Sequence, residues 1–195
     1  MITSRKELNA YIHQDRKMNG RTSRRSLVDV VKEFLYPNQV AVLRYMRKLE
    51  YYTNVRTKLS SVGRIYYDYK YRKASRQLGY EIAINTCGPG LSLPHYGTII
   101  ISGHARIGKN CRIHSCVNIG ASAGREKAPQ IGDNVYIGPS CVLFGDITIA
   151  SNVTIGANAT VNKSFQEENV VIAGTPAEIV KKDYPNWLDF NSVKE

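Results

Sequence analysis

The chain has 195 residues and a formal net charge of +11, a length that allows one sizeable domain and one small one. The charge is concentrated in residues 1–80, which hold 18 Lys and Arg against 6 Asp and Glu, whereas residues 81–195 hold 9 against 10. The first residues lack the apolar core of a signal peptide, and no run is long and apolar enough to cross a bilayer. We therefore expect a cytoplasmic protein. We interpret the positive charge of residues 1–80 as that of solvated helix faces. The alternative is a basic surface that binds polyanions, a membrane surface or phosphate-bearing substrates.

Residues 1–80 have the apolar spacing of helices rather than of strands. Ser4 with Glu7 indicates a capping box at the first helix. Pro37 ends the second helix, and Gly79 ends the fourth. The helices are expected to begin at Ser4, Ser26, Asn38 and about Ser61. This region is predicted to be a small helical N-terminal domain.

From residue 101 to residue 161 an Ile, Leu or Val occupies every sixth position, with one interruption. The series is Ile101, Ile107, Ile113, Ile119, Ile131, Ile137, Leu143, Ile149, Ile155 and Val161. The residue two before each is usually small or aliphatic, and residues i−2 and i share one face of a strand. A six-residue unit cannot bury its apolar face alone, so the hexads must stack around one core as a parallel β-helix. The same six-residue register resumes after the interruption at Arg125. An alternating antiparallel sheet would not require this, so the register favours the β-helix.

The change of period near residue 80 sets the predicted boundaries. The β-helix is expected over residues 81–182, with an irregular first coil whose inward pairs are eight or nine residues apart. Residues 183–195 form a tail whose aromatic residues are expected to cover an open end of the β-helix or a neighbouring subunit. These residues are Tyr184, Trp187 and Phe190. The cysteines lack the paired spacing of a zinc site and are predicted to be reduced packing residues; they are Cys87, Cys111, Cys116 and Cys141.

Three segments together resemble a known family: the run Gly88–His95, the hexads, and the closing run Ala173–Val180. They resemble the hexapeptide-repeat acyltransferases, most closely the serine O-acetyltransferases, over roughly residues 80–182. The resemblance implies an α+β fold in which a left-handed parallel β-helix follows the helical domain, an exception to the usual right-handed crossover. It also implies a homotrimer that binds acetyl-CoA, as co-substrate, in the groove between neighbouring β-helices and transfers acetyl to an acceptor hydroxyl.

His95 is the candidate general base. Acetyl transfer to an alcohol requires a base for the hydroxyl proton, and imidazole titrates near neutral pH. His95 interrupts an apolar, glycine-rich run where packing alone favours an aliphatic residue; a satisfied structural histidine is the alternative. The resemblance favours catalysis and, after deletion of one residue, matches Glu81 to the acidic residue of the family. Glu81 would then orient the imidazole or bind the acceptor, and the alternative is an exposed carboxylate at a strand entry.

The polar stretch 121–129 lies where this family extrudes a loop over the active site, which makes Arg125 and Lys127 candidate substrate-loop residues. The serine enzymes have a histidine just before the proline of this loop, where this chain has Ala128. They also have Asp at the position of Pro94. The chain ends without the terminal Ile by which such enzymes dock into cysteine synthase. These departures leave a sugar of a surface polysaccharide precursor as an acceptor beside L-serine.

Other candidates concern the acyl donor and the groove. By resemblance, the pantetheine and adenine path follows Ala157, Gly174 and Pro176. The candidates for contacts with the CoA phosphates are Lys163, Lys181 and Lys182, although exposed lysines are common near a C-terminus. His114 directly follows an inward residue, so it is expected to face outward and to line the groove between subunits.

Two other functions are left open. A zinc hydratase of the carbonic anhydrase type binds zinc through three histidines across a trimer. His95, His104 and His114 lack the short His-x4-His pair of that class, so no metal is expected. The second alternative is a catalytically silent β-helix used for assembly. We expect no nucleic-acid partner, because the chain has neither a phosphate loop nor a recognisable reading motif.

Overall fold

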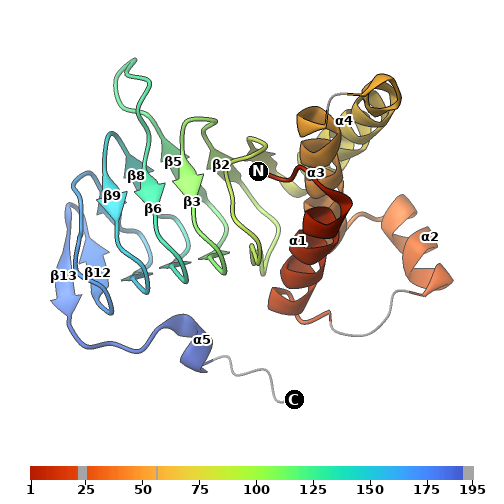
Figure 1. Ribbon diagram of the computed structural model, residues 1–195. Helices are drawn as coiled ribbons and strands as arrows, with labels where there is room; N and C mark the ends of the chain where they lie inside the picture. The colour runs from red at the N-terminus through yellow and green to blue at the C-terminus, as the bar shows by residue number, and fades with distance from the viewer. Residues whose placement is uncertain (22–25, 56, 191–195) are drawn as a thin grey trace.

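The computed structural model describes residues 1–21, 26–55 and 57–190. Helices come first and a parallel β-helix follows them, as Figure 1 shows. The helices are α1 (Arg5–Met18), α2 (Leu27–Leu35), α3 (Gln39–Asn54), α4 (Lys58–Leu78) and, near the C-terminus, the short α5 (Trp187–Phe190). The described strands form three sheets, which are the three faces of the β-helix.

The helix starts follow from their capping residues. Ser4 Oγ accepts the Glu7 N–H at 3.1 Å and the Glu7 carboxylate accepts the Ser4 N–H at 3.1 Å, so the predicted capping box is confirmed. Asn38 caps α3 as predicted, its Oδ1 accepting a backbone N–H at 2.9 Å. The fourth helix begins earlier than the predicted start near Ser61. Thr57 is its N-cap, because Thr57 forms reciprocal side-chain to backbone bonds with the residue three positions later.

Each coil of the β-helix contributes strands to the three sheets. The first sheet contains β1 (Tyr80–Ile82), β2 (Ile99–Ile101), β5 (Val117–Gly120), β8 (Val142–Phe144) and β11 (Thr160–Val161). The second contains β3 (Arg106–Ile107), β6 (Gln130–Ile131) and β9 (Thr148–Ile149). The third contains β4 (Arg112–Ile113), β7 (Tyr136–Ile137), β10 (Thr154–Ile155), β12 (Val171–Gly174) and β13 (Ala177–Lys181). The coils stack in parallel, and the last strand, β13, pairs antiparallel with β12.

Strand pairing explains the interruption in the hexads. Ile99 pairs with Val117, 18 residues later, so a regular coil consists of three hexads. Asn118 pairs with Val142, 24 residues later. The difference of six residues is taken up by the predicted loop 121–129, which extends from the β-helix between β5 and β6 (Figure 1). The inward register resumes after the loop because the insertion has the length of one hexad.

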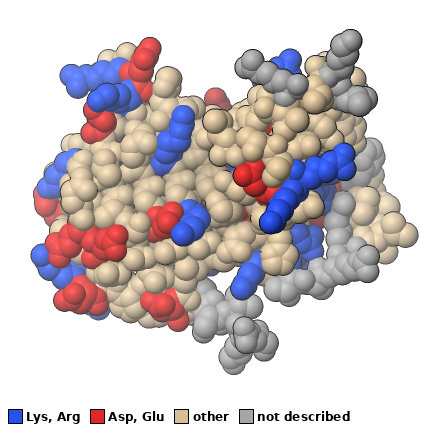
Figure 2. Space-filling model, in the orientation of Figure 1, with Lys and Arg blue, Asp and Glu red and all other residues tan. Residues whose placement is uncertain are grey.

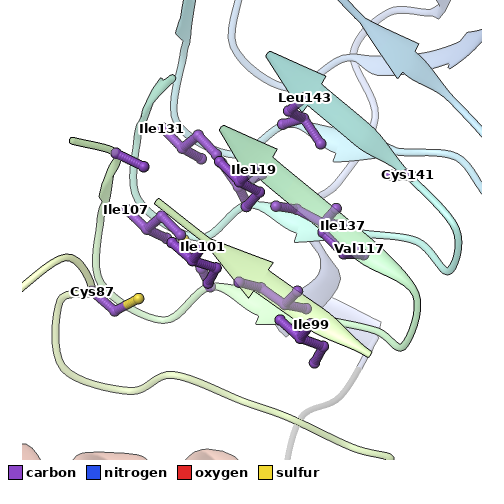
Figure 3. Packing of buried hydrophobic residues seen from close by; sticks show 14 of the residues in the cluster. Cys87, Ile99, Ile101, Ile107, Val117, Ile119, Ile131, Ile137, Cys141 and Leu143 are labelled. Carbon is purple, nitrogen blue, oxygen red and sulfur yellow. The ribbon is translucent and has the colours of Figure 1, made fainter. Parts of the chain in front are cut away.

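The inward positions form the core that the spacing predicts. From Ile101 to Val161, every residue of the hexad series is at most 5% exposed, and so are the small or aliphatic residues two before them. Figure 3 shows these side chains, Ile119 and Ile137 among them, pointing into the space between the sheets. Burial of one such side chain contributes about 1.5–3 kcal/mol to stability, so the stacked hexads supply much of the stabilisation of this region.

The cysteines divide into two kinds. Cys87, Cys111 and Cys141 are buried free thiols in the core, as predicted. Burial raises the pKa of the Cys87 thiol to about 11 and that of Cys111 to about 12, so both stay protonated near neutral pH. The prediction was wrong for Cys116, which is exposed because it occupies a corner with φ 61° rather than an inward strand position.

Asparagines line one edge of the β-helix, between the second and third sheets. Asn110, Asn134 and Asn152 have φ values of 56°, 58° and 60°, a left-handed conformation that Asn tolerates better than most residues. Their side chains form a ladder, with Asn110 Nδ2 donating to Asn134 Oδ1 at 3.2 Å and Asn134 Nδ2 donating to Asn152 Oδ1 at 2.9 Å. Gln14 of α1 donates to Asn110 at 2.9 Å, which ties the helical region to this edge.

A buried ionic network joins the helices to the first coil. Arg47 of α3 is fully buried; its Nε donates to Asp15 Oδ2 of α1 at 2.8 Å and its Nη1 lies 3.1 Å from Glu50 Oε2. The same guanidinium donates to the carbonyls of residues 87 and 88 at 2.8 and 2.6 Å. Asp15 also accepts the N–H groups of residues 90 and 91. Burial alone lowers the pKa of Arg47, but the two carboxylates raise it above its ordinary value, so Arg47 remains charged.

Helix α2 exposes several large apolar side chains. Leu27, Val31 and Leu35 are 85%, 57% and 58% exposed. Its acidic residue Glu33 is buried instead and forms a 2.6 Å ion pair with Arg44 of α3. Glu33 of α2 therefore contacts α3, whereas these three apolar side chains are open to solvent.

The C-terminal tail does not take the first of its two predicted places, an open end of the β-helix; packing on a neighbouring subunit stays a prediction. Trp187 is buried, but it packs beside the second coil, where its Nε1 donates to the Asn110 carbonyl at 3.2 Å and Arg112 lies over its ring. Phe190 is 62% exposed. The aromatic residues thus do not cover an open end, because the antiparallel strand β13 already occupies the last position of the third sheet. No helix within the described ranges has both the length and the apolar character needed to span a membrane.

Candidate active site

One edge of the β-helix brings several of the predicted site residues together. We call it the histidine edge; it consists of the corners between the third and first sheets, residues 94–98, 114–116, 138–141 and 156–159. Successive corners repeat with the spacing of stacked strands, about 4.8 Å. Side chains on neighbouring corners are therefore close enough to touch.

His95 and His114 lie on the first two corners of this edge. Their ring centroids are 5.7 Å apart, and the His114 ring is 5.0 Å from the ring of Tyr136 in the next coil. His95 is exposed, so its imidazole can be reached from solvent. Its backbone carbonyl accepts a 2.6 Å hydrogen bond from the Tyr80 hydroxyl, which fixes the corner that carries the imidazole. Burial raises the pKa of Tyr80, so this phenol stays protonated and remains a donor.

His114 has an unusual environment for an outward residue. Its side chain is partly buried, and its Nε2 is buried without a hydrogen-bond partner among the described residues. Burial, with smaller contributions from Arg112 and His95, lowers the pKa of His114 below its ordinary 6.5. His114 is therefore neutral near pH 7. The expectation that His114 faces outward agrees with its position beside His95.

Glu81 does not lie with the histidines. It is exposed on the outer face of β1, in register with Ile100 of β2. Both residues are in the described part of the chain, and no hydrogen bond or ion pair joins Glu81 to His95. Glu81 instead lines a groove between the first sheet and α4. The hypothesis that Glu81 orients the imidazole thus has no contact to support it within one chain.

The predicted acyl-donor residues lie in two places. Ala157 is on the fourth corner of the histidine edge, and the turn that contains Gly174 and Pro176 adjoins it, because Thr175 Oγ1 donates to the Asn158 carbonyl at 3.2 Å. The site residues on the edge thus extend from the first coil to the last. Lys181 is at the far end of β13, where it pairs with Val171 and its Nζ lies 4.8 Å from the centre of the Tyr184 ring.

The other two lysines proposed for CoA already have partners. Lys163 forms a 2.5 Å ion pair with Glu178, and Lys182 forms a 2.9 Å ion pair with Glu167. These side chains are on the surface, where such pairs contribute little to stability and exchange readily. Both lysines remain able to turn toward an anionic ligand, but neither lies on the histidine edge.

The loop 121–129 lies on a different edge, between the first and second sheets. Arg125 and Lys127 are exposed there, and Lys127 forms a 2.6 Å ion pair with Asp146. Figure 2 shows basic and acidic side chains gathered together over this loop. Within one chain the loop therefore does not cover His95.

Two positions at which the chain departs from the serine enzymes have no polar side chain. Ala128 is 1% exposed and belongs to the hydrophobic core, so its side chain does not reach the loop surface. Pro94 is partly buried beside His95 and has no side-chain hydrogen-bonding group. The described residues include no group of three or more His, Cys, Asp or Glu side chains placed to hold a metal ion. The end of the chain, Val193-Lys194-Glu195, lies outside the described residues.

Comparison with known proteins agrees with this architecture. Residues 128–163 match the bacterial transferase hexapeptide family (six repeats). A serine acetyltransferase from Staphylococcus xylosus is 39% identical over 99 residues, which are 49% of this chain and 45% of that protein. The solved serine acetyltransferase of Neisseria gonorrhoeae superposes with a TM-score of 0.70 at 22% identity, covering 98% of this chain and 73% of that one. A serine acetyltransferase solved in complex with CoA gives a TM-score of 0.67 at 20% identity, covering 90% and 70%.

This chain resembles the serine acetyltransferases. The predicted resemblance and fold class, helices followed by a left-handed parallel β-helix, are thereby confirmed. The chain spans about half the length of the curated relatives it matches.

Sequence reasoning missed two residues that contact the histidine edge. Tyr136 contacts His114 across coils, and it is 22 positions further along the chain because the inserted loop lies between them. The hexad count contained this signal, since Tyr136 occupies the outward position after the inward Val135. Tyr80 was placed at the end of the helical region, although it begins β1 and holds the His95 carbonyl.

Proposed function

We propose that this chain is an acetyl-CoA-dependent O-acetyltransferase that acts on an acceptor hydroxyl. The observation that carries the proposal is the arrangement of one edge: an accessible imidazole, His95, at one end and the residues matched to the acyl-donor path, Ala157 and the turn of residues 174–176, at the other. Such an edge allows an extended thioester to lie along the coils with its reactive end at a base. The resemblance to serine acetyltransferases, including one solved with CoA, supports the same donor.

His95 is proposed as the general base. One of its ring nitrogens takes the hydroxyl proton of the acceptor while the oxygen attacks the carbonyl carbon of the acetyl thioester. The tetrahedral intermediate then expels the CoA thiolate, and the imidazolium returns the proton to the sulfur. The products are the acetyl ester and free CoA. A base in this position accounts for roughly 10²–10⁴ in rate.

The neighbouring residues support this role. His114 is neutral near pH 7, so it adds no positive charge against the imidazolium that forms on His95 during the reaction. The Tyr80 hydroxyl holds the backbone of His95 in place. We propose that His114 and Tyr80 position the His95 imidazole rather than take part in the chemistry.

The proposed active assembly is a homotrimer. The loop residues Arg125 and Lys127 lie on a different edge from His95, so they can meet an acceptor at His95 only from a neighbouring copy. We also propose a cytoplasmic location, because acetyl-CoA is available there. Sedimentation of the purified protein should give a trimer or a multiple of one. A stable monomer at micromolar concentration would contradict the shared site.

The acceptor is proposed to be either L-serine or a sugar hydroxyl of a surface polysaccharide precursor. The resemblance to serine acetyltransferases supports serine. The buried Ala128 and the apolar Pro94 support the larger acceptor, because neither position offers a polar group to hold the small serine molecule. The deciding quantity is the ratio of kcat/KM values for serine and for a panel of sugars. Serine used at about 10⁴ M⁻¹s⁻¹ or above, ahead of every sugar, would reject the sugar.

Release of free thiol from acetyl-CoA in the presence of these acceptors tests the activity itself. His95→Ala should lower turnover by roughly 10² or more while leaving acetyl-CoA affinity nearly unchanged. The matched control is His13→Ala, which removes an exposed imidazole from α1 and should retain nearly full turnover. Turnover of His95→Ala above about a tenth of wild type would assign the base elsewhere. Absence of thiol release with any acceptor would favour an assembly protein, and stoichiometric zinc would favour a hydratase.

A further inference from the structure

A groove between α4 and the first sheet is not explained by the proposed catalytic steps. Two adjoining hollows of about 770 and 690 Å³ lie there, and they share lining residues from α3, α4 and the strand region after β1. The shared residues are Leu49, Asp68, Arg72, Arg76 and Ile84. The two hollows form one continuous surface, which we call the α4 groove.

Cations outnumber anions along the α4 groove. Asp68 is paired with Arg72, whose Nε donates to both carboxylate oxygens at 2.8 and 2.9 Å. Three further cations of α4 line the groove, and the structure records no ion pair for them among the described residues: Arg64, Lys73 and Arg76. The remaining anion is Glu81 on the opposite wall. The groove therefore carries an excess of positive charge that the protein itself does not neutralise.

The rest of the groove is apolar and aromatic. Ile65 and Tyr69 of α4 are 69% and 62% exposed although both lie beside these cations. Ile84 and Ile100 line the opposite wall. A solvated helix face does not need large apolar groups at such exposure, whereas a ligand with an anionic part and an apolar or ring part would be complementary to both features.

The α4 groove opens toward the edge between the first and second sheets, because the corner residues Ser102 and Gly103 line it. The loop 121–129 lies on the same edge. In the proposed homotrimer this edge meets the histidine edge of a neighbouring copy, so a molecule bound in the groove would have one end near the His95 of that copy. The link between the groove and the acceptor therefore rests on the proposed assembly.

We propose that the α4 groove binds the phosphate or diphosphate ester of the acceptor substrate. The anion meets Arg64, Lys73 and Arg76, and the apolar or ring part of the carrier lies against Ile65 and Tyr69. The identity of this ligand as the acceptor rests on the proposed function, but binding can be measured without it. A nucleoside diphosphate sugar and a prenyl diphosphate share the required chemistry, since both join a diphosphate to a ring or apolar group.

The first test is equilibrium binding measured by calorimetry on the full chain. The probes are a nucleoside diphosphate hexose, a short-chain prenyl diphosphate and inorganic pyrophosphate. The double variant Arg64→Gln/Arg76→Gln should weaken binding of at least one of the two esters about tenfold or more, because it removes two charge-assisted contacts. The control Arg106→Gln/Lys109→Gln removes two exposed cations from the β-helix and should change the dissociation constant less than about twofold.

The outcomes of this test identify the carrier of the diphosphate and decide whether the α4 groove is a specific binding site. Preference for the nucleotide ester or for the prenyl ester identifies the carrier. Pyrophosphate bound as tightly as both esters would remove the role of the apolar wall and overturn the proposal. Equal binding by wild type and the Arg64/Arg76 variant, or equal losses in both double variants, would also overturn it, since the charge would then act only as a solvated surface.

A second test distinguishes this inference from the proposed function. With a phosphate-bearing acceptor, the Arg64/Arg76 variant should raise KM about tenfold or more, whereas the Arg106/Lys109 variant should not. Acetylation with an unchanged KM in the Arg64/Arg76 variant would reject the groove as the acceptor site and leave the acetyltransferase intact. Specific, groove-dependent binding without any acetylation would retain the ester site and reject the acetyltransferase.

Discussion

The β-helix and the helical region place their apolar residues in opposite ways. In the β-helix the hexad residues are buried on the inside, with at most 5% exposure from Ile101 to Val161. In the helical region, α2 exposes Leu27 and Leu35 while burying Glu33 against Arg44. A repeat packs against its own copies, so its period determines which side is buried. A helix packs against a partner elsewhere in the chain, and its own period does not say whether the apolar or the polar side will meet that partner.

The two regions also differ in what stabilises them. The β-helix depends on hydrophobic burial repeated coil by coil. The junction between the helical region and the first coil depends on one buried cation, Arg47, held by two carboxylates and two carbonyls. A core substitution in the β-helix should therefore lower stability through lost hydrophobic burial, whereas a substitution at the junction should lower it through an unpaired buried charge.

Replacement of Arg47 should have the largest effect. Arg47→Met leaves Asp15 and Glu50 buried without their cation, which should lower the free energy of unfolding by about 3–5 kcal/mol. The matched control is Arg72→Met, which breaks an exposed pair with Asp68 and should cost about 0–1 kcal/mol. Urea denaturation followed by tyrosine fluorescence and circular dichroism measures both. A loss below about 1 kcal/mol for Arg47→Met would mean that the junction does not depend on this network.

A core truncation in the β-helix should come next. Ile137 is 0% exposed, so Ile137→Ala removes buried methyl groups and leaves a cavity, at a cost of about 2–4 kcal/mol. Val142→Ala on the outer face, at 39% exposure, should cost less than about 1 kcal/mol. Thermal and urea denaturation of the two variants would measure the contrast. Equal losses would show that the inward register does not govern stability.

A smaller, pH-dependent effect is expected at His114. Burial lowers the pKa of His114 in the folded state, so below pH 6.5 the unfolded chain binds the proton more readily than the folded one. The contribution of the neutral imidazole is thus complete above pH 6.5 and is lost as the pH falls toward the folded pKa. His114→Gln should make the melting temperature fall less between pH 7 and pH 5.5 than it does in wild type. An unchanged slope would show that His114 has an ordinary pKa.

The smallest effect is expected in the loop. Lys127→Ala removes the exposed ion pair with Asp146 and should change the free energy of unfolding by no more than about 1 kcal/mol. The same variant in the assembled enzyme reports on the proposed role of Lys127 near the acceptor, through KM rather than stability. A stability loss comparable to that of Ile137→Ala would show that the loop belongs to the packed structure.

The sequence was sufficient for whatever depends on local spacing. The inward residues followed from the hexads, whereas the loop 121–129 followed from the resemblance to a family that extrudes a loop at this point. The capping of the first helix followed from Ser4 and Glu7, because a capping box joins residues three positions apart. Each of these features is decided within a few residues or repeated at a fixed period.

Contacts between distant segments were out of reach. Asp15 and Arg47 meet only after α1 and α3 pack together, and nothing in either helix marks them as buried. His114 and Tyr136 contact each other because they lie in adjacent coils, although the inserted loop separates them in the sequence. The role matched to Glu81 from the family stays a prediction: Glu81 is outward on β1, and within one chain no hydrogen bond or ion pair joins it to His95.

The ends of the coil stack determine how this molecule can associate. A stack of parallel coils has unpaired backbone groups at each end, and a further coil could add there without limit. Here Leu43 and Met46 of α3 pack into the same core as the first coil, and on the third sheet the last strand, β13, runs in the reverse direction. A second β-helix therefore meets a helix layer at one end and a mismatched strand at the other. Addition of a further parallel coil is therefore hindered at those two places, by the helix layer at one end and by the reversed strand on the third sheet at the other.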